Sequence, residues 1–504
     1  MATKRAESQG PIFREDEGLP EGWVWARLGG GIVDDIQPGF ACGEHDVEGA
    51  SVPHLRPMNV TAEGTVSLSN TKHVPRAYIT SDTRLLRKGD VLFNNTNSPE
   101  LVGKTAHFDL NGEFAFSNHM TRLRCRGAAL LPAYCSLALH RKWHEGYFLR
   151  ICNNHVSQAS ISRSVLADAE IPLPPLPEQR RIVERVEALL ARVNEARARL
   201  ARAPALLKAF RQAVLAAACA GKLTAEWRES RTPDRDRDDV PSGWRIATVS
   251  EVASREPRSI QSGPFGSNLL HSEFQTTGVL AIGIDNVLDG SFSLGRKHRI
   301  SHAKSAELSK YRARPGDVLI TVMATVGRVC VVPDDLEPAI ITKHVYRITP
   351  DRTQVEPRYL MFSLMGDPGL TEDIAEQVRG QTRPGINGVI LKGLQIRVSP
   401  LDEQREIVRR VDALFALADA IEAKVAVAQK RAEALTQGIL AKAFRGELVS
   451  TEAALARAEG RSYESAKEFL ERVLTKKAQG RATNSGHPPR RRRNSRLHQS
   501  GGGS

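Results

Sequence analysis

The sequence lacks the motifs that most catalytic and metal-binding proteins carry. Its six cysteines are scattered, and no two have the Cys-x-x-Cys spacing, so the chain suggests neither a zinc site nor a disulfide framework. It contains no Asn/Asp-Pro-Pro-aromatic motif of adenine methyltransferases, no Gly-x-Ser-x-Gly and no His-Glu-x-x-His. No catalytic residue and no metal ligand is therefore predicted in this chain.

Long apolar runs are also absent. No apolar stretch reaches membrane-spanning length, and the N-terminus lacks the apolar core of a signal peptide. Both absences favour a cytoplasmic protein that has no membrane partner. Residues 1–18 are polar, and residues 480–504 are basic and of low complexity, so both ends are predicted to be disordered.

Acidic residues are too few to balance the basic ones. Lys and Arg number 71 against 58 Asp and Glu, which gives a formal net charge of +13. Six arginines lie in the last 24 residues, where no acidic residue occurs, but the rest of the chain is still basic. Such an excess favours an acidic polymer, most often nucleic acid, as the partner. A basic protein without such a partner has the same composition, so charge alone does not decide between them.

One long stretch of the chain occurs twice. Residues 175–223 begin PLPEQRRIVERV, residues 400–448 begin PLDEQREIVRRV, and the two copies align without a gap at an offset of 225 residues. In each copy, apolar residues recur at alternating spacings of four and three, the pattern of a helix whose apolar stripe packs on a partner helix. Each helix would span roughly 60 Å. Pro204 interrupts the first copy and is expected to divide it into two helical pieces.

The duplication favours pairing of the two helices with each other over two unrelated surface helices. A globular segment lies between them in the chain, so antiparallel pairing would place the two globular segments at opposite ends of a rod. The predicted fold is α+β, with two similar mixed α/β domains separated by two long antiparallel coiled-coil helices and related by a pseudo-twofold internal duplication.

The two globular segments are expected to share one fold. Gly89-Asp90-Val91-Leu92 recurs as Gly316-Asp317-Val318-Leu319, and both segments open with a Gly-Trp pair, at residues 22–23 and 243–244. The loops between the matched points differ, which suggests two readers of different targets on similar frames. The predicted division is a disordered N-terminus at 1–18, a first domain at 19–174, a long helix at 175–223, a linker at 224–240, a second domain at 241–399, a second long helix at 400–448, short helices at 449–479 and a disordered basic tail at 480–504.

Several loops carry the side chains that DNA recognition needs. Arg and Lys hydrogen-bond guanine, Asn and Gln hydrogen-bond adenine, and basic or backbone groups bind phosphate. For any single loop, an ordinary solvated turn is an equally good interpretation. The candidate DNA-binding residues are Asn94, Asn95, Asn97, Lys104, Asn118, His119 and Gln158 in the first domain, and Gln261, Ser262, Ser267, Arg328, Lys343, His344, Gln381 and Arg383 in the second.

The duplicated helices resemble a known family. The PLPEQR and PLDEQR helices, together with the run Ile260 to Ser267 and the Gly-Asp-Val-Leu motif of both domains, resemble the specificity subunits of type I restriction–modification enzymes over about residues 19–450. The resemblance implies that each domain is a target-recognition domain for one half of a bipartite, asymmetric DNA site. It also implies that the helices fix the spacing of the half-sites and dock two methyltransferase subunits. The residues expected to take part in docking are Glu178, Gln179, Arg180, Glu403, Gln404 and Arg405.

The same resemblance implies that the chain is not itself an enzyme. S-adenosylmethionine, ATP and Mg would be used by the methyltransferase and the restriction/translocase subunits, in defence against foreign DNA, and this chain would hold no cofactor. The competing interpretation is a self-contained DNA methyltransferase or nuclease with fused recognition domains, and the missing catalytic motifs weigh against it. A coiled-coil scaffold without nucleic-acid function is a third interpretation.

Overall fold

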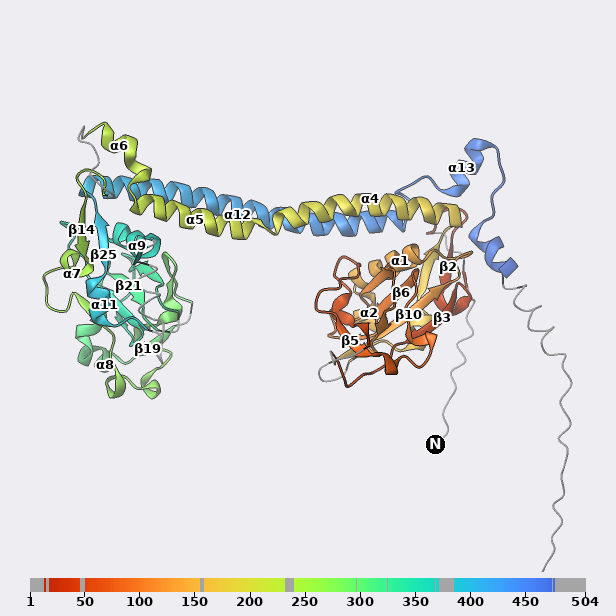
Figure 1. Cartoon of the computed structure of the whole chain (residues 1–504), viewed down its shortest axis with the longest axis horizontal. Coiled ribbons are helices and arrows are strands. Elements are labelled where there is room, and N and C mark those ends of the chain that lie inside the picture. The colour runs from red at the N-terminus through yellow and green to blue at the C-terminus, as the bar shows by residue number, and fades with distance from the viewer. Residues whose placement is uncertain are drawn as a thin grey trace, which may run out of the picture. The chain divides into compact units, whose positions relative to one another are not determined.

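The computed structural model divides the chain into two compact units. Unit 1 comprises Met1–Ala198 and Gln429–Ser504, and unit 2 comprises Arg199–Ala428. Figure 1 colours the chain from red to blue in sequence order, so unit 1 contains both the red and the blue ends. The predicted basic tail lies outside the described residues. The structure describes residues 13–14, 18–45, 50–154, 158–231, 240–295, 297–323, 325–367, 369–370, 385–473 and 475.

The duplicated stretches form long helices. The first is divided into α4 (Leu176–Leu200) and α5 (Ala203–Cys219), and the second is the single helix α12 (Leu401–Ala443). Pro204 stands in the first turn of α5. At that position its missing N–H costs no intrahelical hydrogen bond, and its ring prevents continuation of the preceding helix. The predicted division of the first copy at this proline is confirmed.

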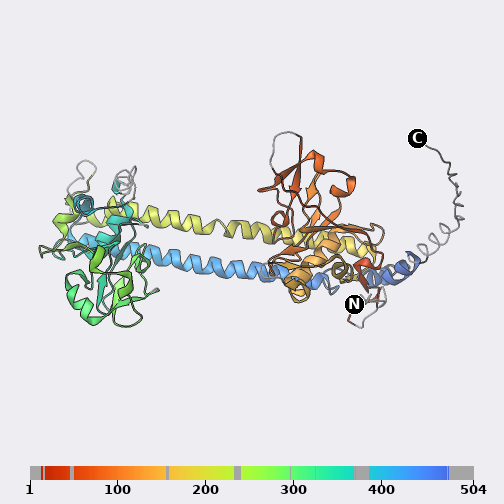
Figure 2. The ribbon, with the colours of Figure 1, turned by 90° about the horizontal axis from the view of Figure 1, so that it is seen from below.

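Within each unit the helices pack antiparallel. In unit 1 the start of α4, around Ile182, shares a hydrophobic core with the end of α12, around Leu440. In unit 2 the end of α5, around Val214, packs with the start of α12, around Ile407. Figure 2 shows α4 and α5, in yellow and yellow-green, beside α12 in blue. The predicted antiparallel pairing is therefore confirmed inside each unit.

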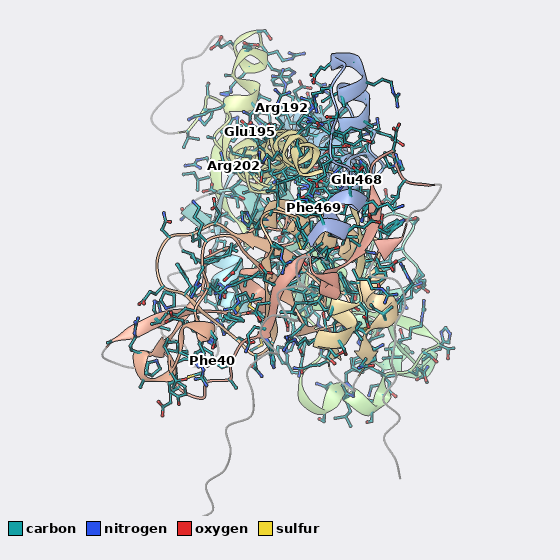
Figure 3. The ribbon with its side chains drawn as sticks, turned by 90° about the vertical axis from the view of Figure 1, so that its right-hand side faces the viewer. Phe40, Arg192, Glu195, Arg202, Glu468 and Phe469 are labelled. Carbon is teal, nitrogen blue, oxygen red and sulfur yellow. The ribbon has the colours of Figure 1, made fainter. Side chains whose placement is uncertain are left out.

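Unit 1 builds its domain from short strands and helices. The strands are β1 (Phe13–Arg14), β2 (Val24–Arg27), β3 (Val33–Pro38), β4 (Ser51–Leu55), β5 (Lys72–Pro75), β6 (Asp90–Asn94), β7 (Thr96–Asn97), β8 (Thr105–Phe108), β9 (Ala115–Phe116), β10 (Met120–Cys125), β11 (Asn153–Asn154), β12 (Ala159–Ser160) and β13 (Glu170–Leu173). The helices are α1 (Pro132–His144), α2 (Tyr147–Ile151), α3 (Arg163–Ala167) and α13 (Glu452–Glu459). A further helical stretch, at residues 466–473, packs on the core through Phe469 (Figure 3).

The central sheet of unit 1 has the order β3-β10-β6-β8, and all of its neighbouring strands are antiparallel. Helix α1 packs against β6 and β8. Three smaller sheets, β1-β2-β13, β11-β12-β7 and β5-β4-β9, surround this layer, and the last contains the parallel pair β4–β9.

Unit 2 repeats this arrangement. Its strands are β14 (Arg245–Thr248), β15 (Ile260–Ser262), β16 (Val279–Ile282), β17 (Val287–Leu288), β18 (Ser291–Phe292), β19 (His298–Ile300), β20 (Arg312–Ala313), β21 (Val318–Thr321), β22 (Val329–Val331), β23 (Ala339–Ile341), β24 (Val345–Ile348) and β25 (Gln395–Val398). Its helices besides α5 are α6 (Ala225–Glu229), α7 (Val249–Val252), α8 (His302–Glu307), α9 (Pro357–Gly366) and α11 (Gly388–Gly393).

The two central sheets have the same topology. The order β15-β24-β21-β22 reproduces β3-β10-β6-β8 with the same antiparallel pairing, and α9 packs on β21 and β22 as α1 packs on β6 and β8. The second sheet, β19-β16-β23-β20, contains the parallel pair β16–β23, as β4–β9 is parallel in unit 1. The predicted fold, a duplicated mixed α/β domain with long helices, is confirmed.

The repeated Gly-Asp-Val-Leu motif begins the same strand in both units. Gly89 and Gly316 have left-handed backbone, with φ of 94° and 81°, which glycine adopts without strain. The next residue in each copy accepts a hydrogen bond from the N–H three residues earlier, at 2.8 Å for Asp90 and 2.7 Å for Asp317. The apolar residues that follow are buried in β6 and β21. The motif is therefore a tight turn into a fully covered strand.

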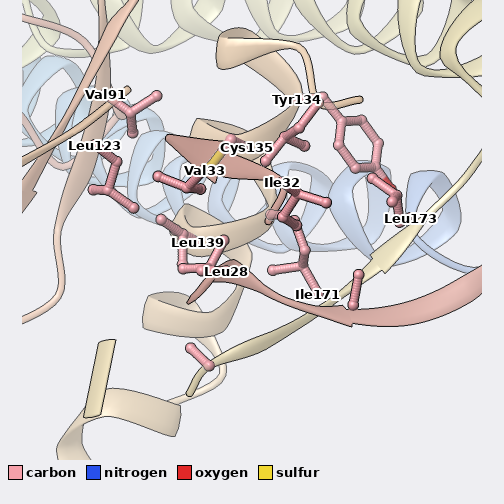
Figure 4. Close-up of a cluster of buried hydrophobic side chains, with 14 of the residues drawn as sticks. Leu28, Ile32, Val33, Val91, Leu123, Tyr134, Cys135, Leu139, Ile171 and Leu173 are labelled. Carbon is pink, nitrogen blue, oxygen red and sulfur yellow. The ribbon is translucent and has the colours of Figure 1, made fainter. Parts of the chain in front are cut away.

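The same buried hydrogen bond occurs inside each of the two units. Figure 4 shows Tyr134 and Leu139 of α1 among apolar side chains of the neighbouring strands. The hydroxyl of Tyr134, which is fully buried, donates to the carbonyl of Pro172 at 2.8 Å. The hydroxyl of Tyr359 in α9 donates to the carbonyl of Arg397 at 2.7 Å. In both units a buried tyrosine thus ties the covering helix to the strand that leads into the long helix.

Two segments that were predicted to lack regular structure contain short elements. Phe13 and Arg14, within the segment predicted as disordered, form β1 on the edge of β2, which corrects that prediction for these two residues. The edge of β2 offers unpaired backbone groups, and a two-residue strand has no periodicity to detect. Helix α6 occupies the start of the predicted linker, where Arg228 is buried against Glu403 at 3.4 Å.

Removal of either tyrosine hydroxyl tests the hydrogen bonds from Tyr134 to Pro172 and from Tyr359 to Arg397. Tyr134→Phe and Tyr359→Phe each delete a buried donor and leave a carbonyl oxygen unpaired, so each is expected to lower the free energy of unfolding by about 1–2 kcal/mol. Urea unfolding followed by circular dichroism would measure the loss. An unfolding midpoint equal to that of the wild type in both variants would contradict these hydrogen bonds.

Candidate nucleic-acid interface

The candidate DNA-binding residues of unit 1 gather at one end of its central sheet. Strand β6 ends at Asn94, which pairs with Met120, the first residue of β10. The backbone N–H groups of Asn95 and Thr96 both donate to the carbonyl of His119, at 3.1 and 3.3 Å. We call this end of the sheet edge 1.

A second small sheet extends edge 1. Asn97 of β7 pairs with Ala159 of β12, and Gln158 directly precedes that strand. Lys104 comes from the other neighbour of β6, and its carbonyl accepts the N–H of Asn94 at 2.9 Å. The structure therefore brings together all seven residues predicted in this domain, namely Asn94, Asn95, Asn97, Lys104, Asn118, His119 and Gln158.

Edge 1 lies away from the long helix of its unit. Phe40, which follows β3, accepts the N–H of Asn118 through its carbonyl at 3.1 Å, so it marks this edge. Figure 3 shows Phe40 at one end of the unit and Arg192 and Glu195 of α4 at the other. The part of edge 1 around Phe40 is therefore separate from this end of α4.

Three of the seven side chains, those of Asn94, Asn95 and Lys104, are buried, and DNA contact by them stays a prediction that their burial does not favour. Asn94 donates from Nδ2 to the carbonyl of Pro57 at 3.0 Å, and Asn95 donates to the hydroxyl of Thr121 at 2.9 Å. Lys104 Nζ donates to a backbone carbonyl at 2.5 Å, and burial lowers the pKa of this amine. A buried polar group without a partner is costly, so these three side chains hold the loops of edge 1 together from inside.

The other four side chains remain at the surface. Asn118 and Gln158 are exposed, and Asn97 and His119 are partly exposed. Amide and imidazole groups can donate to and accept from base edges. DNA contact by these four residues stays a prediction.

The equivalent end of the central sheet in unit 2 has the same backbone arrangement, and we call it edge 2. The N–H of Val322 donates to the carbonyl of His344 at 3.1 Å. Arg328 takes the place of Lys104, since its carbonyl accepts the N–H of Thr321 at 2.9 Å. Ser262 ends β15 beside the central strand β24.

Edge 2 is more exposed and more basic than edge 1. Lys343 and Ser267 are exposed, and Gln261, Ser262, Arg328 and His344 are partly exposed. Partial burial and the neighbouring charge of Lys343 lower the pKa of His344, which favours the neutral ring at pH 7. The two remaining candidates, Gln381 and Arg383, lie outside the described residues.

Two exposed apolar side chains at these edges were not among the candidates. Met58 is 55% exposed and follows Pro57, whose carbonyl binds Asn94 of edge 1. Phe265 is 53% exposed and follows β15 at edge 2. Polar groups alone were selected from the sequence, whereas apolar side chains can contact the thymine methyl group. Phe265 lies within the run Ile260–Ser267, so a search of that run for apolar residues would have found it.

The two glutamines predicted for docking attach each domain to its helix. Gln179 accepts one backbone N–H just before α1 and donates to carbonyls before α1 and after β13, at 2.9–3.0 Å. Gln404 makes the same three hydrogen bonds before α9 and after β25, at 2.7–2.9 Å. Each amide thus joins two chain segments of its domain to the first turn of the long helix.

The two glutamates complete these anchors. Glu178 accepts the indole N–H of Trp23 at 3.0 Å, and Glu403 accepts that of Trp244 at 2.9 Å. Glu403 also has a buried cationic partner, Arg228, at 3.4 Å. Both carboxylates lie in the first turn of a helix, where the helix dipole favours negative charge. We refer to each Glu-Gln pair with its bound tryptophan as a domain anchor.

Four of the six residues predicted for docking are buried, which does not favour direct docking by their side chains. Glu178, Gln179, Glu403 and Gln404 are at most 1% exposed, and their polar atoms are occupied inside their own units. The prediction was derived from a resemblance that carries no information on burial. Arg180 and Arg405 are exposed, so docking by these two residues stays a prediction.

The carboxyl group of Glu178, in the domain anchor of unit 1, has a raised pKa. Burial raises the pKa of Glu178 to about 7, although the Trp23 indole and the N–H of Glu452 stabilise its carboxylate. This carboxyl group therefore changes its protonation close to neutral pH.

The described residues contain no single membrane-spanning helix and no cluster of metal ligands. No single described helix is long and apolar enough to cross a membrane, and a bent pair, Leu176–Cys219 with Lys222–Glu229 at 74°, meets the length and composition only together. Within the described ranges, no group of three or more His, Cys, Asp or Glu residues is placed to hold a metal ion.

Comparison with known proteins points to one family. A family model described as "Type I restriction modification DNA specificity domain" matches residues 58–201 and 292–427. The chain is similar to the specificity subunit of the type I restriction enzyme EcoBI from Escherichia coli, with 30% identity over 437 residues that cover 84% of this chain and 86% of that protein. It is also similar to the EcoKI specificity subunit from Escherichia coli K12, with 28% identity over 86% of this chain and 90% of that protein.

Solved structures agree with this comparison. A chain from a structure titled "Structural basis underlying complex assembly and conformational transition of the type I R-M system" is similar with a TM-score of 0.62 and 25% identity, over 85% of this chain and 99% of that chain. The HsdS subunit from Thermoanaerobacter tengcongensis has the same fold, with a TM-score of 0.51 and 24% identity over 85% of this chain and 98% of that chain.

The raised pKa of Glu178 predicts a pH-dependent stability of unit 1. A carboxyl group with a folded-state pKa of about 7 and an ordinary value of 4.5 contributes stability that is fully present below pH 4.5 and is lost as the pH rises through 7. Between pH 5 and pH 8, Glu178→Gln is therefore expected to flatten the fall in the unfolding free energy. Thermal unfolding across this pH range would measure the slopes.

Glu184→Gln, which removes an exposed carboxylate from the same helix, is the matched control for net charge. Parallel pH slopes for the wild type and Glu178→Gln would contradict the assigned pKa.

Proposed function

Because the chain belongs to the DNA specificity subunits of type I restriction–modification systems, we propose that each of its two domains reads one half of a bipartite, asymmetric DNA site. The chain is the non-catalytic DNA-recognition subunit of such a complex. A self-contained methyltransferase or nuclease is not favoured, because the relatives are specificity subunits. In this proposal edge 1 reads one half-site and edge 2 reads the other.

The observation that carries the proposal is the repeated edge. Each unit presents exposed side chains at the equivalent end of its own central sheet. The backbone there is held by equivalent hydrogen bonds in the two units. The side chains themselves differ, with amides prominent at edge 1 and cations at edge 2. One frame with two different recognition surfaces suits a target whose two halves have different sequences.

The long helices set the distance between the half-sites in this proposal. Helix α12 is continuous over 43 residues; it belongs to unit 2 up to Ala428 and to unit 1 from Gln429. A single helix that is shared by both readers limits the separation of the bases they contact, as dimer geometry does for repressors. Phosphate contacts by basic groups would add affinity that falls as salt rises.

The partners follow from the same proposal. Two methyltransferase subunits dock along the helices, with exposed Arg180 and Arg405 among the contacts. Restriction and translocase subunits join this core, and the complex works in the cytoplasm. S-adenosylmethionine, ATP and Mg are used by those partners.

Sequencing of methylated DNA tests the proposal. The full chain is co-expressed with its methyltransferase subunit, and methylated adenines are located by single-molecule sequencing. A new motif of two unlike half-sites with a fixed gap is expected. A stable complex that produces no new methylated motif would overturn the proposal, and binding of the isolated chain to DNA would then separate a recognition role from a scaffold.

Shortening the helices tests their role in spacing. Removal of one heptad from α4 and of the facing heptad from α12 shortens the pair by roughly 10 Å, which corresponds to about three base pairs. The gap in the methylated motif is expected to shrink by about that number while both half-sites stay the same. An unchanged gap in a variant that still methylates would contradict the spacing role.

A further inference from the structure

Edges 1 and 2 carry different side chains at one equivalent position. Asn118 in unit 1 and Lys343 in unit 2 each stand directly before a histidine, His119 or His344. Both pairs lie in the turn that leads into the central strand, β10 or β24. This position therefore allows the two recognition surfaces to be compared residue by residue.

The backbone of the two turns is the same. The N–H of Met120 donates to the carbonyl of Ser117 at 2.9 Å, and the N–H of Val345 donates to the carbonyl of Thr342 at 3.0 Å. Asn118 and Lys343 are thus the second residue of a four-residue turn in both units. The carbonyl of the following histidine accepts an N–H from the segment after β6 or β21, at 3.1 Å in each unit.

A buried arginine follows each turn on the central strand. Arg122 and Arg347 follow the two histidines by three residues and are 0% and 7% exposed. Arg122 donates to the carbonyl of Leu85 at 3.1 Å, and Arg347 donates to the carbonyl of Arg312, which is the equivalent residue of unit 2. These contacts hold the central strand of both units in the same way at the end of the sheet where β6 and β21 begin, while the backbone hydrogen bonds named above hold the turn itself.

The side chains at this position are available to a ligand. Asn118 and Lys343 are both exposed. Among the described residues, neither the side-chain amide of Asn118 nor the ammonium of Lys343 makes a hydrogen bond or an ion pair. The backbone carbonyl of Asn118 accepts a hydrogen bond from the side chain of Asn95 at 3.2 Å. Because the backbone of the turn is already ordered, contact with a base would require ordering of the side chain alone.

The two side chains match different bases. An asparagine amide hydrogen-bonds N6 and N7 of adenine in the major groove, whereas a lysine ammonium hydrogen-bonds O6 and N7 of guanine. We propose that positions 118 and 343 are equivalent base-reading positions, with Asn118 reading an adenine in the half-site of unit 1 and Lys343 reading a guanine in the half-site of unit 2. This inference rests on the proposed function, in which each unit reads one half-site.

Exchange of the two residues tests the inference in the full chain with its methyltransferase subunit. Asn118→Lys is expected to change one position of the unit 1 half-site from adenine to guanine, while the other half-site and the gap stay the same. Lys343→Asn is expected to produce the reverse change in the unit 2 half-site. Single-molecule sequencing of methylated DNA reads both half-sites at once, so each unaltered half is an internal control.

Asn111→Lys is the matched control for charge. Asn111 is exposed in the same unit and lies after Phe108, at the end of β8 opposite to edge 1. This control variant is expected to keep the wild-type motif. A wild-type split motif that also persists in Asn118→Lys would overturn the inference and leave the proposed function intact. A wild type without any split motif would overturn the proposed function itself.

A variant that no longer methylates DNA is examined by binding. The purified complex is competed with duplexes that differ at one position of one half-site, and Asn118→Ala is compared with the wild type. Discrimination at a single unit 1 position is expected to fall by roughly tenfold to a hundredfold. A uniform loss of affinity for all duplexes, with a weaker dependence on salt, would assign the side chain to phosphate and overturn the inference.

Discussion

A buried glutamate and glutamine in the first turn of each long helix attach the domain of that unit to its own helix. Gln179 and Gln404 each satisfy three backbone groups, and Glu178 and Glu403 each bind the indole of a tryptophan at the start of the domain. Buried amides and carboxylates are tolerated only when their hydrogen bonds are made, and they then select one arrangement of the surrounding chain. The position of each domain on its own helix therefore depends on this pair, and so does the direction in which its recognition edge faces.

This arrangement separates the frame from the two edges that we propose to read the target. Buried groups such as Asp90 and Asp317, or Tyr134 and Tyr359, play the same part in both units. Differences gather at the exposed turns of the edges. A loop side chain can change without disturbing the core, so a duplicated frame can carry two unlike half-site specificities. The chain is the non-catalytic recognition subunit of its complex, so it needs no catalytic group for this task.

Much of the fold could be predicted from the sequence, because long-range repetition and heptad spacing are visible without coordinates. The division at Pro204 and the antiparallel pairing inside each unit follow from those patterns. Burial of individual polar residues does not follow. Asn94 and Lys104 are polar residues of the kind found in surface loops, yet both donate hydrogen bonds to backbone carbonyls of another loop. Glu178 is expected at the surface from its charge alone, but its carboxylate is buried beside the indole of Trp23. Exposed apolar residues such as Met58 and Phe265 were missed for the opposite reason, because apolar character in a sequence usually signals burial.

The central claim is that the two domains are interchangeable readers on equivalent anchors. The most direct test replaces residues 241–399 with a second copy of residues 19–174, so that both Glu-Gln anchors hold the same domain. Methylated DNA is then sequenced from cells that also express the methyltransferase subunit. The account predicts a symmetric motif made of two copies of the unit 1 half-site with the wild-type gap. Retention of the original asymmetric motif by the folded chimera would contradict it.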